Sequence, residues 1–365
     1  MKNLLFVTNE SSHGGAERML TWVANCLAES SEYCVYFCNL DKQQPFYSLS
    51  TKIKLIMFPE TANEHLIYRN TIGFLKKTFF LLKIIKQEKI DLIINFNDHA
   101  LYNIMFCKFF LKKIKVMVSQ RVDPNAIVSK TGRFRLKLIN FSDALVCQTK
   151  AALDFFPEKT RQNAVVIPNP IHNRPSQAWN IENTDDYIIN VARIEIKQKR
   201  QDILLKAFAI VHKTYPNLVL KLYGSKINAD YEKMIQLISE LNLNEVVDYC
   251  GVSNNIIEEM LKAKLLVLSS DYEGIPNAVL EAMTLGMPIV STDCRPDGAR
   301  MLLSQGCGII TPVGDSELLA EAILKILQDP MYAAKMGKNA LRSTTRFDEK
   351  KIAQQWYDYI YSILK

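Results

Sequence analysis

The sequence predicts an α/β protein made of two Rossmann-like domains, each built on a parallel sheet. Its 365 residues exceed the roughly 100 to 200 residues of one ordinary domain. Short apolar runs rich in β-forming residues alternate with helical patterns, which is the arrangement that a parallel sheet requires. This alternation is interrupted once, near the middle of the chain. Two such domains in tandem are expected to face a central cleft.

Residues 1–170 predict an N-terminal Rossmann-like domain. Its strands are expected at residues 3–8, 34–38, 52–57, 91–95, 116–119, 144–147 and 165–167. The stretch that follows is rich in Pro, Asn and acidic side chains and carries no hydrophobic period. Residues 171–186 are therefore interpreted as a linker.

Residues 187–346 predict a second Rossmann-like domain. Its strands are expected at residues 188–192, 218–223, 246–250, 265–269, 288–291 and 308–311, with helices such as 202–212 and 278–285 between them. Residues 347–365 have the pattern of a C-terminal amphipathic helix, which can cross back to the first domain.

Composition predicts a cytoplasmic protein. No segment approaches the roughly 20 uninterrupted apolar residues that a membrane span needs. The first residues, MKNLLFVTNESSHGG, turn polar after a short apolar run, so they indicate a first strand rather than a signal peptide. The eight Cys are scattered, with no CxxC pair and no His at metal-ligand spacing, which predicts buried free thiols.

Positive charge is concentrated in the first half of the chain. Residues 1–170 hold 23 Lys and Arg against 14 Asp and Glu, whereas residues 171–365 hold 22 against 24. This asymmetry predicts a surface that meets an anionic partner. No motif typical of nucleic-acid binding is present, so nucleic acid is not expected as that partner.

Residues 73–89 and 106–115 place lysines among Phe and Leu at roughly helical spacing. This pattern fits helices that lie peripherally on the cytoplasmic face of an anionic membrane. Helices that simply cover the sheet, with lysines that snorkel to solvent, are the alternative interpretation.

The loop His13 to Arg18 follows the first strand and opens a helix. Its consecutive Gly14 and Gly15 allow a close backbone approach, and unpaired N–H groups at a helix start favour an anion such as phosphate. The dinucleotide fingerprint GxGxxG is absent, and a Gly-Gly turn is also a common tight connection.

Two segments of the second domain carry charged side chains at strand ends, where open α/β sheets bind ligands. The first, Arg193 to Lys199, offers a guanidinium fork and ammonium groups that can hold a diphosphate; a solvated basic loop is the alternative.

The second segment, Ser270 to Ala282, has Glu273 before a helix and Glu281 about one turn inside it. A loop carboxylate can accept from sugar hydroxyls, and a helix start can face phosphate. Alternatively, Glu281 complements the helix dipole. The candidate donor-binding residues here are Gly274, Ile275, Asn277, Ala278 and Glu281.

Five runs resemble, in matching order, the retaining glycosyltransferase family 4, particularly members that build bacterial surface polysaccharides. They are GGAER, VIPNPI, NVARIEIKQKRQDILLKAF, EGIPNAVLEAMTLGMPIVSTD and GCGIITPVGDSELLAEAI. The resemblance covers nearly the whole chain and is strongest from Tyr187 to Leu324. It implies the GT-B fold, with an acceptor-side first domain and a nucleotide-sugar-binding second domain.

The resemblance also implies roles for residues. Arg193 and Lys199 match the basic pair that holds the donor diphosphate, and Glu273 and Glu281 match the acids on the donor sugar and the ribose. Gly14 and Gly15 match the loop that closes over the phosphate. His99 falls where related enzymes often carry a histidine beside the sugar, although a surface or capping role is the alternative.

The sequence departs from the family pattern at two points. The spacing from Arg193 to Lys199 is one residue longer than usual, which leaves Lys197 as a rival for the phosphate role. Ala192 replaces the usual glycine before the arginine, a change small enough to keep close packing. The run SQRVDP resembles a segment of members that build bacterial surface polysaccharides, and Arg121 in it is expected to face the acceptor or the cleft.

The sequence therefore predicts retaining transfer of a hexose or N-acetylhexosamine from a nucleoside diphosphate sugar, with UDP as the expected nucleotide. The expected acceptor is a glycan, lipid-pyrophosphate-linked or polysaccharide. No metal or other cofactor is expected, because no DxD-type site is present and a basic pair is available. A sugar-nucleotide epimerase and a non-catalytic binding partner of the same architecture are the alternatives.

Overall fold

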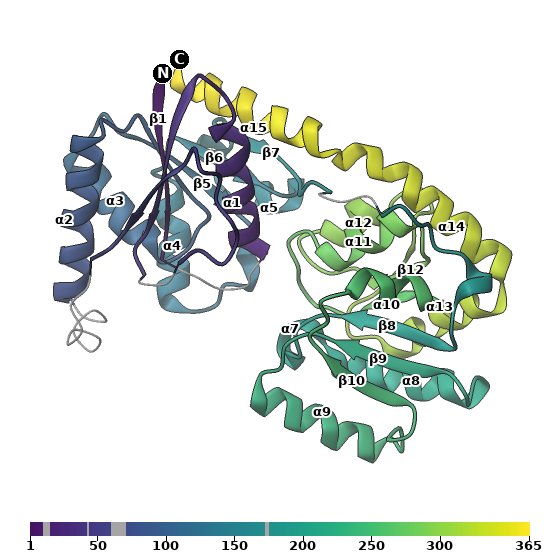
Figure 1. Ribbon diagram of the computed structural model, residues 1–365. Coiled ribbons are helices and arrows are strands. Elements are labelled where there is room, and N and C mark those ends of the chain that lie inside the picture. The colour runs from purple at the N-terminus through teal and green to yellow at the C-terminus, as the bar shows by residue number, and fades with distance from the viewer. Residues whose placement is uncertain (10–14, 42–43, 60–70, 172–174) are drawn as a thin grey trace. The chain divides into compact units, whose positions relative to one another are not determined.

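The computed structural model describes residues 1–9, 15–41, 44–59, 71–171 and 175–365. They form two compact units, the first comprising Met1–Asn169 with Lys350–Lys365 and the second Pro170–Glu349. Each unit is a parallel sheet with helices on both faces, as Figure 1 shows. The predicted fold class, an α/β protein of two Rossmann-like domains, is confirmed.

The first unit has a seven-stranded parallel sheet in the order β3-β2-β1-β4-β5-β6-β7. Its strands are β1 (Lys2–Thr8), β2 (Tyr33–Asn39), β3 (Lys54–Met57), β4 (Leu92–Asn95), β5 (Lys115–Gln120), β6 (Ala144–Cys147) and β7 (Ala164–Val166). The central strands are buried on both faces, which is why they read as continuous apolar runs in the sequence. The strand order reverses between β1 and β4, the switch point where such sheets bind ligands.

Helices enclose an apolar core on each face of this sheet. One core is shared with α2 (Thr71–Gln87), α3 (Ala100–Phe110) and α4 (Lys130–Ile139), the other with α1 (Gly15–Ala28) and α15 (Glu349–Leu364). The shorter elements are η1 (Pro124–Ala126), α5 (Lys150–Asp154) and α6 (Glu158–Arg161).

The C-terminal helix α15 belongs to the first unit through its apolar stripe. Ile352, Trp356 and Ile360 recur every four residues and are buried against the first sheet. The Trp356 ring stacks on Phe96, with 5.7 Å between ring centroids. The last helix of the chain therefore supports the residue that directly follows β4.

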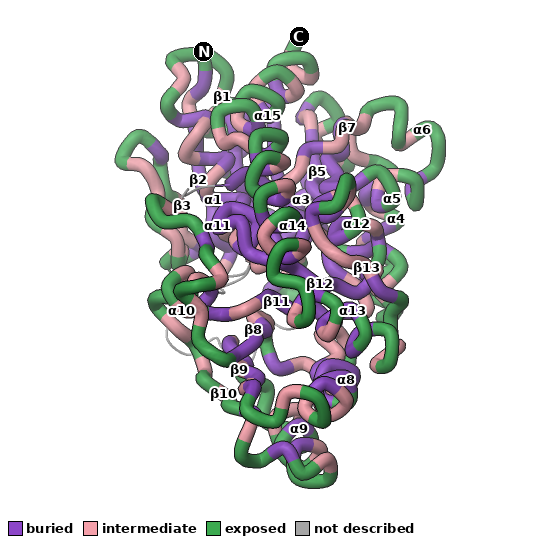
Figure 2. The backbone as a smooth tube through the Cα atoms, turned by 90° about the vertical axis from the view of Figure 1, so that its right-hand side faces the viewer, coloured by how far each residue is buried: buried purple, intermediate pink, exposed green. Residues whose placement is uncertain are grey.

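The second unit has a six-stranded parallel sheet in the order β10-β9-β8-β11-β12-β13, which reverses between β8 and β11. Its strands are β8 (Tyr187–Val191), β9 (Val219–Tyr223), β10 (Val247–Gly251), β11 (Leu266–Leu268), β12 (Ile289–Thr292) and β13 (Ile309–Thr311). Its helical elements are η2 (Ile181–Asn183), α7 (Ile196–Lys199), α8 (Gln201–Thr214), α9 (Asn228–Glu240), α10 (Ile256–Lys262), α11 (Asn277–Leu285), α12 (Gly298–Leu303), α13 (Ser316–Gln328), α14 (Pro330–Ser343) and η3 (Thr344–Phe347). Figure 2 shows strands such as β12 buried and much of α9 exposed.

The segment interpreted as a linker packs on the second unit where it is described. Trp179 is buried, and its indole Nε1 donates to the Ala263 carbonyl at 2.8 Å. The Ile171 amide donates to the Phe347 carbonyl at 2.9 Å. A single buried indole contributes a large apolar area, and one such residue produces no periodic pattern that sequence analysis can read.

Every strand predicted from the sequence is present, with ends within two residues of the expected ones. In the described part of the chain, no helix is long and apolar enough to cross a membrane. All eight cysteines are free, and five of them are buried as predicted. Cys250 is an exception because it faces solvent from the edge strand β10, whereas Cys26 and Cys34 are half-buried.

Candidate active site

The predicted donor-site residues lie in two loops at the switch point of the second sheet. One loop follows β8 and the other follows β11, and these two strands are neighbours in the sheet although 74 residues separate Lys199 from Glu273. Strand pairing therefore assembles groups that are remote in sequence.

Lys199 and Glu273 form an ion pair at the centre of this arrangement. The Lys199 Nζ lies 2.6 Å from the Glu273 Oε1, and the two side chains are only 14% and 11% exposed. The Ser270 hydroxyl donates to the same carboxylate oxygen at 2.7 Å. A mostly buried charge pair of this kind keeps its geometry because each charge is matched and hydrogen-bonded.

Hydrogen bonds to backbone carbonyls join the two loops to each other. The Ser269 hydroxyl donates to the Lys199 carbonyl at 2.7 Å, and the Asp271 amide donates to the Gln198 carbonyl at 2.9 Å. The Gln198 Nε2 donates to the Tyr272 carbonyl at 3.0 Å. The position of Lys199 is thus set by the loop that carries Glu273.

The rival lysines of α7 lie in different surroundings. Lys197 is exposed to solvent, whereas Lys199 is directed at Glu273. Residues two positions apart on a helix point in nearly opposite directions, so only one of them can face the switch point. The geometry favours Lys199 for the phosphate role, which stays a prediction.

Arg193 lies just after β8 and is accessible to a ligand. Its side chain is 58% exposed and makes an ion pair with Glu195 at 2.7 Å. Exposed pairs of this type contribute only about 0–1 kcal/mol, so a phosphate can replace the carboxylate at low cost. Its role on the donor diphosphate stays a prediction.

Arg200 was missed by sequence reasoning. It lies in the left-handed region, with φ of 52°, between α7 and α8. Its guanidinium contacts both carboxylate oxygens of Asp271, at 3.0 and 2.9 Å, and also Asp202 at 2.9 and 3.1 Å. The hydrogen bonds that Arg200 donates to Asp202, followed by those to Asp271, raise its pKa. No sequence signal identifies an arginine whose partner lies 71 residues away.

The remaining donor-site candidates surround the start of α11. Asn277 and Ala278 form its first turn, Ile275 is buried directly before it, and Glu281 lies half-buried at its fifth position. Gly298 packs so closely on this loop that an added Cβ would lie 1.8 Å from the Gly274 carbonyl oxygen. The loop is therefore held by backbone contact at the start of the helix.

Close packing at Ala192 is provided by its neighbour strand. A Cβ added to Gly224, at the end of β9, would lie 2.1 Å from the Ala192 carbonyl oxygen. Gly224 also has a φ of +144°, which disfavours other residues. The family pattern places a glycine at the position of Ala192. Here the close packing at this position is provided instead by Gly224 on the adjacent strand.

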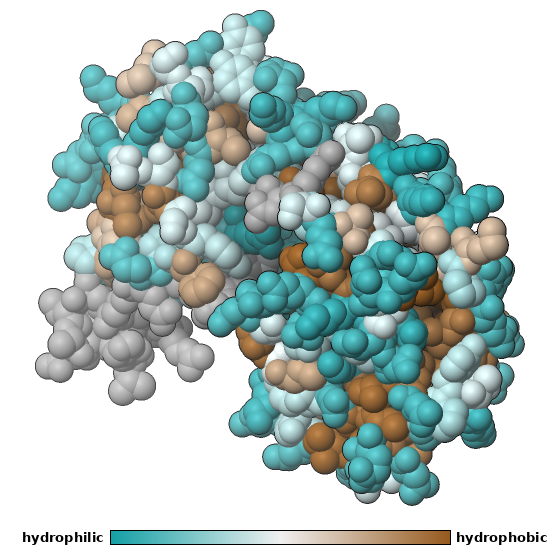
Figure 3. Space-filling model, turned by 45° about the vertical axis from the view of Figure 1, so that its right-hand side comes forward, coloured by the Kyte–Doolittle hydropathy of each residue, from teal (hydrophilic) through white to brown (hydrophobic). Residues whose placement is uncertain are grey.

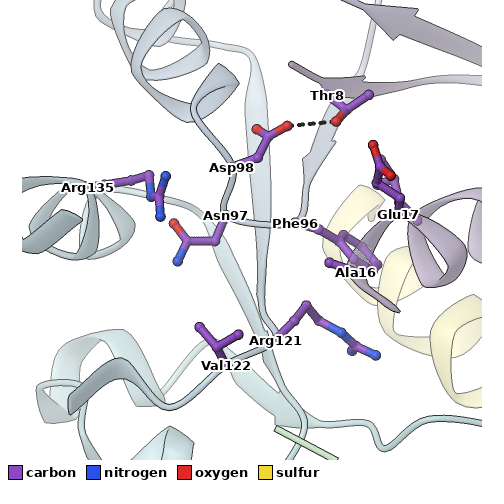
Figure 4. Close-up of a pocket in the computed structure, with 10 residues that line it drawn as sticks. Thr8, Ala16, Glu17, Phe96, Asn97, Asp98, Arg121, Val122 and Arg135 are labelled. Carbon is purple, nitrogen blue, oxygen red and sulfur yellow. Dashed lines mark hydrogen bonds between the residues drawn. The ribbon is translucent and has the colours of Figure 1, made fainter. Parts of the chain in front are cut away.

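The switch point of the first sheet carries a cavity of about 200 Å³, shown in Figure 4. The cavity is lined by Thr8, Ala16, Glu17, Leu20, Phe96, Asn97, Asp98, Arg121, Val122 and Arg135. These residues come from β1, α1, α4 and the loops after β4 and β5. Sequence reasoning identified Arg121 in this group, whereas Arg135, Asn97 and Asp98 were not proposed as ligands.

Asp98 organises the loop after β4. Its carboxylate accepts from the Thr8 hydroxyl at 2.7 Å, the Asn9 amide at 2.6 Å, the Asn95 side chain at 2.6 Å and the Ala100 amide at 2.9 Å. These four neutral donors hold β1 and β4 together at the cavity edge. The carboxylate is thereby fixed in place by neutral donors, and its negative charge also acts on the nearby Lys77.

The other candidates of the first unit lie around this cavity. His99 precedes α3, is exposed, makes no capping hydrogen bond and is not among the lining residues. Partial burial, followed by the nearby Arg135 charge, lowers the pKa of His99 below 6.5. Gly15 is the exposed first residue of α1, and Gly14 lies outside the described residues. The roles of His99 and of both glycines stay predictions.

A larger cavity of about 460 Å³ lies at the opposite edge of the second sheet, before the strands begin. It is lined by Ile181, Asp186, Thr214, Tyr215, Pro216, Asn217, Leu218, Lys264, Ile326, Leu327, Pro330 and Ala333. Figure 3 shows apolar side chains gathered between hydrophilic ones on the second unit. None of the predicted site residues lies in this cavity.

Comparison with known proteins shows which protein family part of this chain matches. Residues 173–343 match the family model described as "Glycosyl transferases group 1". An uncharacterized glycosyltransferase of Methanocaldococcus jannaschii is 27% identical over 359 residues, which cover 84% of this chain and 87% of the relative. An α-1,4-N-acetyl-D-galactosaminyltransferase of Campylobacter jejuni, named for a diNAcBac-PP-undecaprenol glycan, is 23% identical over 99% of this chain and 98% of its own.

Solved structures share the fold over the full chain. HepE of Anabaena, crystallised with UDP and glucose, has a TM-score of 0.80 at 19% identity, covering 99% of this chain and 100% of its own. At this level of identity the likeness shows the fold, and it confirms the predicted GT-B architecture.

Proposed function

We propose the reaction of this chain, a glycosyltransferase whose residues 173–343 match the model of the group 1 glycosyl transferases. It transfers a hexose or N-acetylhexosamine from a UDP sugar to a glycan acceptor, with retention of anomeric configuration. The acceptor is a lipid-pyrophosphate-linked glycan of bacterial surface polysaccharide synthesis.

The observation that carries the proposal is the Lys199–Glu273 pair at the switch point of the second sheet. A diphosphate that leaves the sugar gains negative charge, which Lys199 and the accessible Arg193 stabilise. Glu273 accepts from hydroxyls of the donor sugar, and Glu281 accepts from the ribose. The bond between the anomeric carbon and the diphosphate oxygen breaks, and the acceptor hydroxyl attacks that carbon on the face that the leaving group vacates, which retains the configuration. The hydroxyl proton passes to the departing diphosphate oxygen.

Relatives support the two substrates. HepE was crystallised with UDP and glucose, which favours a UDP sugar as donor. The Campylobacter jejuni relative is named for a glycan carried on undecaprenol through PP, which favours a lipid-linked acceptor. A cationic first domain, with a net excess of positive charge over residues 1–170, suits such an anionic acceptor.

The outer face of α2 and α3 supports peripheral binding to an anionic membrane surface. These helices lie side by side, joined by Asn103, which donates to the Phe74 carbonyl at 2.9 Å. Phe79 and Phe109 are 67% and 73% exposed. Large exposed aromatic side chains flanked by cations are typical of interfacial helices.

The structure separates the lysines of α2 into two groups. Lys76, Lys83 and Lys86 are exposed, so lipid phosphate can reach them. Lys77 is half-buried, donates to the Asn9 side-chain oxygen at 2.8 Å, and has a pKa lowered by burial. Lys77 therefore does not belong to the membrane-facing set in which sequence spacing placed it.

The reaction is proposed to need no metal. The cations Arg193 and Lys199 supply the charge that a divalent ion would otherwise bring to the diphosphate. Chelator-resistant turnover tests this part of the proposal separately from the choice of donor.

The deciding experiment is a UDP-release assay over a panel of UDP sugars, with EDTA, in the presence and absence of a lipid-pyrophosphate glycan. We expect acceptor-dependent release with one donor, and an α-configured product from an α-configured donor by NMR. Release without acceptor would indicate hydrolysis or epimerase-type chemistry. Silence over the panel with UDP still bound would overturn the choice of donor sugar.

A further inference from the structure

Another cavity of the first unit lies where its strands begin, at the sheet edge opposite the switch point. It has a volume of about 360 Å³. Among its lining residues, Lys2 and Lys115 are the first residues of β1 and β5, and Leu364 is the last residue of α15. Figure 1 shows the two ends of the chain side by side at this edge. The cavity is therefore separate from the one at the switch point, which lies at the other ends of the strands.

Positive charge prevails in the lining of this cavity. The lining contains the lysines Lys2, Lys86, Lys113 and Lys115 and a single carboxylate, that of Asp91. That carboxylate already accepts from the Lys2 ammonium at 3.4 Å and from a backbone amide of β1 at 2.8 Å, and the Lys115 ammonium donates to a backbone carbonyl of α15. The ammonium groups of Lys86 and Lys113 form no ion pair with a described residue. These two cations can therefore receive an anion in the cavity.

The apolar lining of the cavity belongs to the core of the first unit. Ile85, Ile90 and Ile114 are buried among the residues that α2 and α3 pack against the sheet. Lys86 directly follows Ile85 in the last turn of α2, and Lys113 directly precedes Ile114. The backbone that carries both lysines is therefore anchored by packed core side chains, which gives the cavity a fixed shape.

Exposed side chains of α2 and α3 lead to this cavity. Phe79, Lys83 and Lys86 are exposed and are spaced four and three residues apart, so they lie along one face of α2. Phe109 and Phe110 are 73% and 58% exposed and end α3 directly before the chain enters the cavity lining. Apolar side chains of an interfacial helix enter the boundary between headgroups and acyl chains, where the lipid phosphates are close. The lysines of the cavity thus lie next to aromatic side chains that can enter a membrane surface.

We propose that this cavity binds the phosphate of an anionic phospholipid, with Lys86 and Lys113 as the donors and Phe109 and Phe110 beside the acyl chains. The inference rests on the proposed function, because it assigns a headgroup site to the membrane surface proposed there. A lysine ammonium is a compact charge with three donors, which suits the oxygens of a phosphate. The volume corresponds to about a dozen waters of roughly 30 Å³ each, which is enough for a phosphate and part of its headgroup.

The test compares two double variants of the full chain by sedimentation with vesicles of equal parts phosphatidylcholine and phosphatidylglycerol. Lys86→Gln with Lys113→Gln removes the two cavity donors. Lys83→Gln with Lys112→Gln removes the same charge from exposed neighbours outside the cavity. A diffuse attraction to the surface predicts equal losses of binding in both variants. A discrete phosphate site predicts a loss about tenfold or more larger in the cavity variant, which is the result we expect.

Equal losses in the two variants, or no binding of the wild type to these vesicles, would overturn the inference. Calorimetric titration with inorganic phosphate is the second arm. If the wild type binds inorganic phosphate, the cavity variant does not, and both variants bind vesicles equally, the cavity belongs to a soluble phosphate and the lipid is wrong. UDP release with the acceptor dispersed in detergent requires no vesicle and should be unchanged in both variants, so a failure of the proposed function would appear in that assay instead.

Discussion

The two units place their charges differently although both follow the same sheet topology. At the second switch point three cations have carboxylate partners: Lys199 pairs with Glu273, Arg193 with Glu195, and Arg200 with Asp271 and Asp202. At the first switch point, Arg121 and Arg135 have none within the described residues. A buried charge that is matched and hydrogen-bonded keeps its geometry, whereas a buried charge without a counterion carries a desolvation cost. The difference teaches that the same sheet topology can hold a paired and an unpaired set of charges.

The largest expected effect is a loss of stability that is confined to one of the two units. Trp356→Ala should destabilise the first unit by about 3–5 kcal/mol, because it removes a buried indole that supports Phe96. Hydrogen exchange should rise in β1 and β4 and remain unchanged in β8 and β11. Trp179→Ala is the matched variant of the second unit, and it should give the reverse pattern. Equal loosening of both sheets by either variant would show that the units do not behave separately.

Catalysis should depend on the matched pair of the second unit. Lys199→Ala should lower kcat/KM by about 10- to 150-fold, since a charge-assisted contact contributes roughly 1.5–3 kcal/mol. Lys197→Ala is the control, because that side chain is exposed on the same helix. Steady-state UDP release measures both, and a larger loss at Lys197 would contradict the assignment.

Membrane binding should depend on the first unit. Lys76→Gln with Lys83→Gln should weaken partitioning to anionic vesicles about 30-fold, because each exposed lysine contributes roughly 1 kcal/mol near such a surface. The same change at Lys206 and Lys213, exposed on α8 of the second unit, should have little effect. Sedimentation with vesicles at two salt concentrations makes the measurement. Equal losses of vesicle binding in both variants would show that the lysines of α2 contribute no more to membrane binding than those of α8.

Positioning by Arg200 should matter less than the Lys199 charge itself. Arg200→Ala breaks the contacts to Asp271 and Asp202 and should cost about 1–2 kcal/mol of stability in the second unit. We also expect kcat to fall because the loop that carries Glu273 is no longer fixed. Arg200→Lys should restore stability in part. An unchanged kcat would limit Arg200 to a structural role.

The smallest effect concerns pH. The pKa of His99 is lowered below 6.5 in the folded chain, so the unfolded chain binds the proton more tightly. Its contribution to stability is therefore complete above about 6.5 and is lost as the pH falls toward the lowered value. His99→Gln should reduce this dependence without altering stability at pH 8. A denaturation series from pH 5 to 8 on both proteins tests the sign.

The strands and the donor site could be predicted because their signals are local. Buried parallel strands are continuous apolar runs, and the segments around Lys199 and Glu273 each follow such a run. The carboxyl ends of neighbouring parallel strands lie at the same edge of a sheet, so the sequence alone predicts that the two loops that follow them lie together. His99 lies outside the cavity that its neighbours line, and its role beside the donor sugar stays a prediction.

The sequence by itself determined the fold class, the order of elements, and which loops carry the charged candidates, because hydrophobic periodicity and turn residues act over short distances. Only the tertiary structure decided which charges are paired. It set Lys199 rather than Lys197 against Glu273, turned Lys77 away from the membrane-facing set, and left Arg121 buried without a carboxylate. These outcomes depend on contacts between residues remote in sequence, because burial and ion pairing contribute to the free energy of folding only when those residues are in contact.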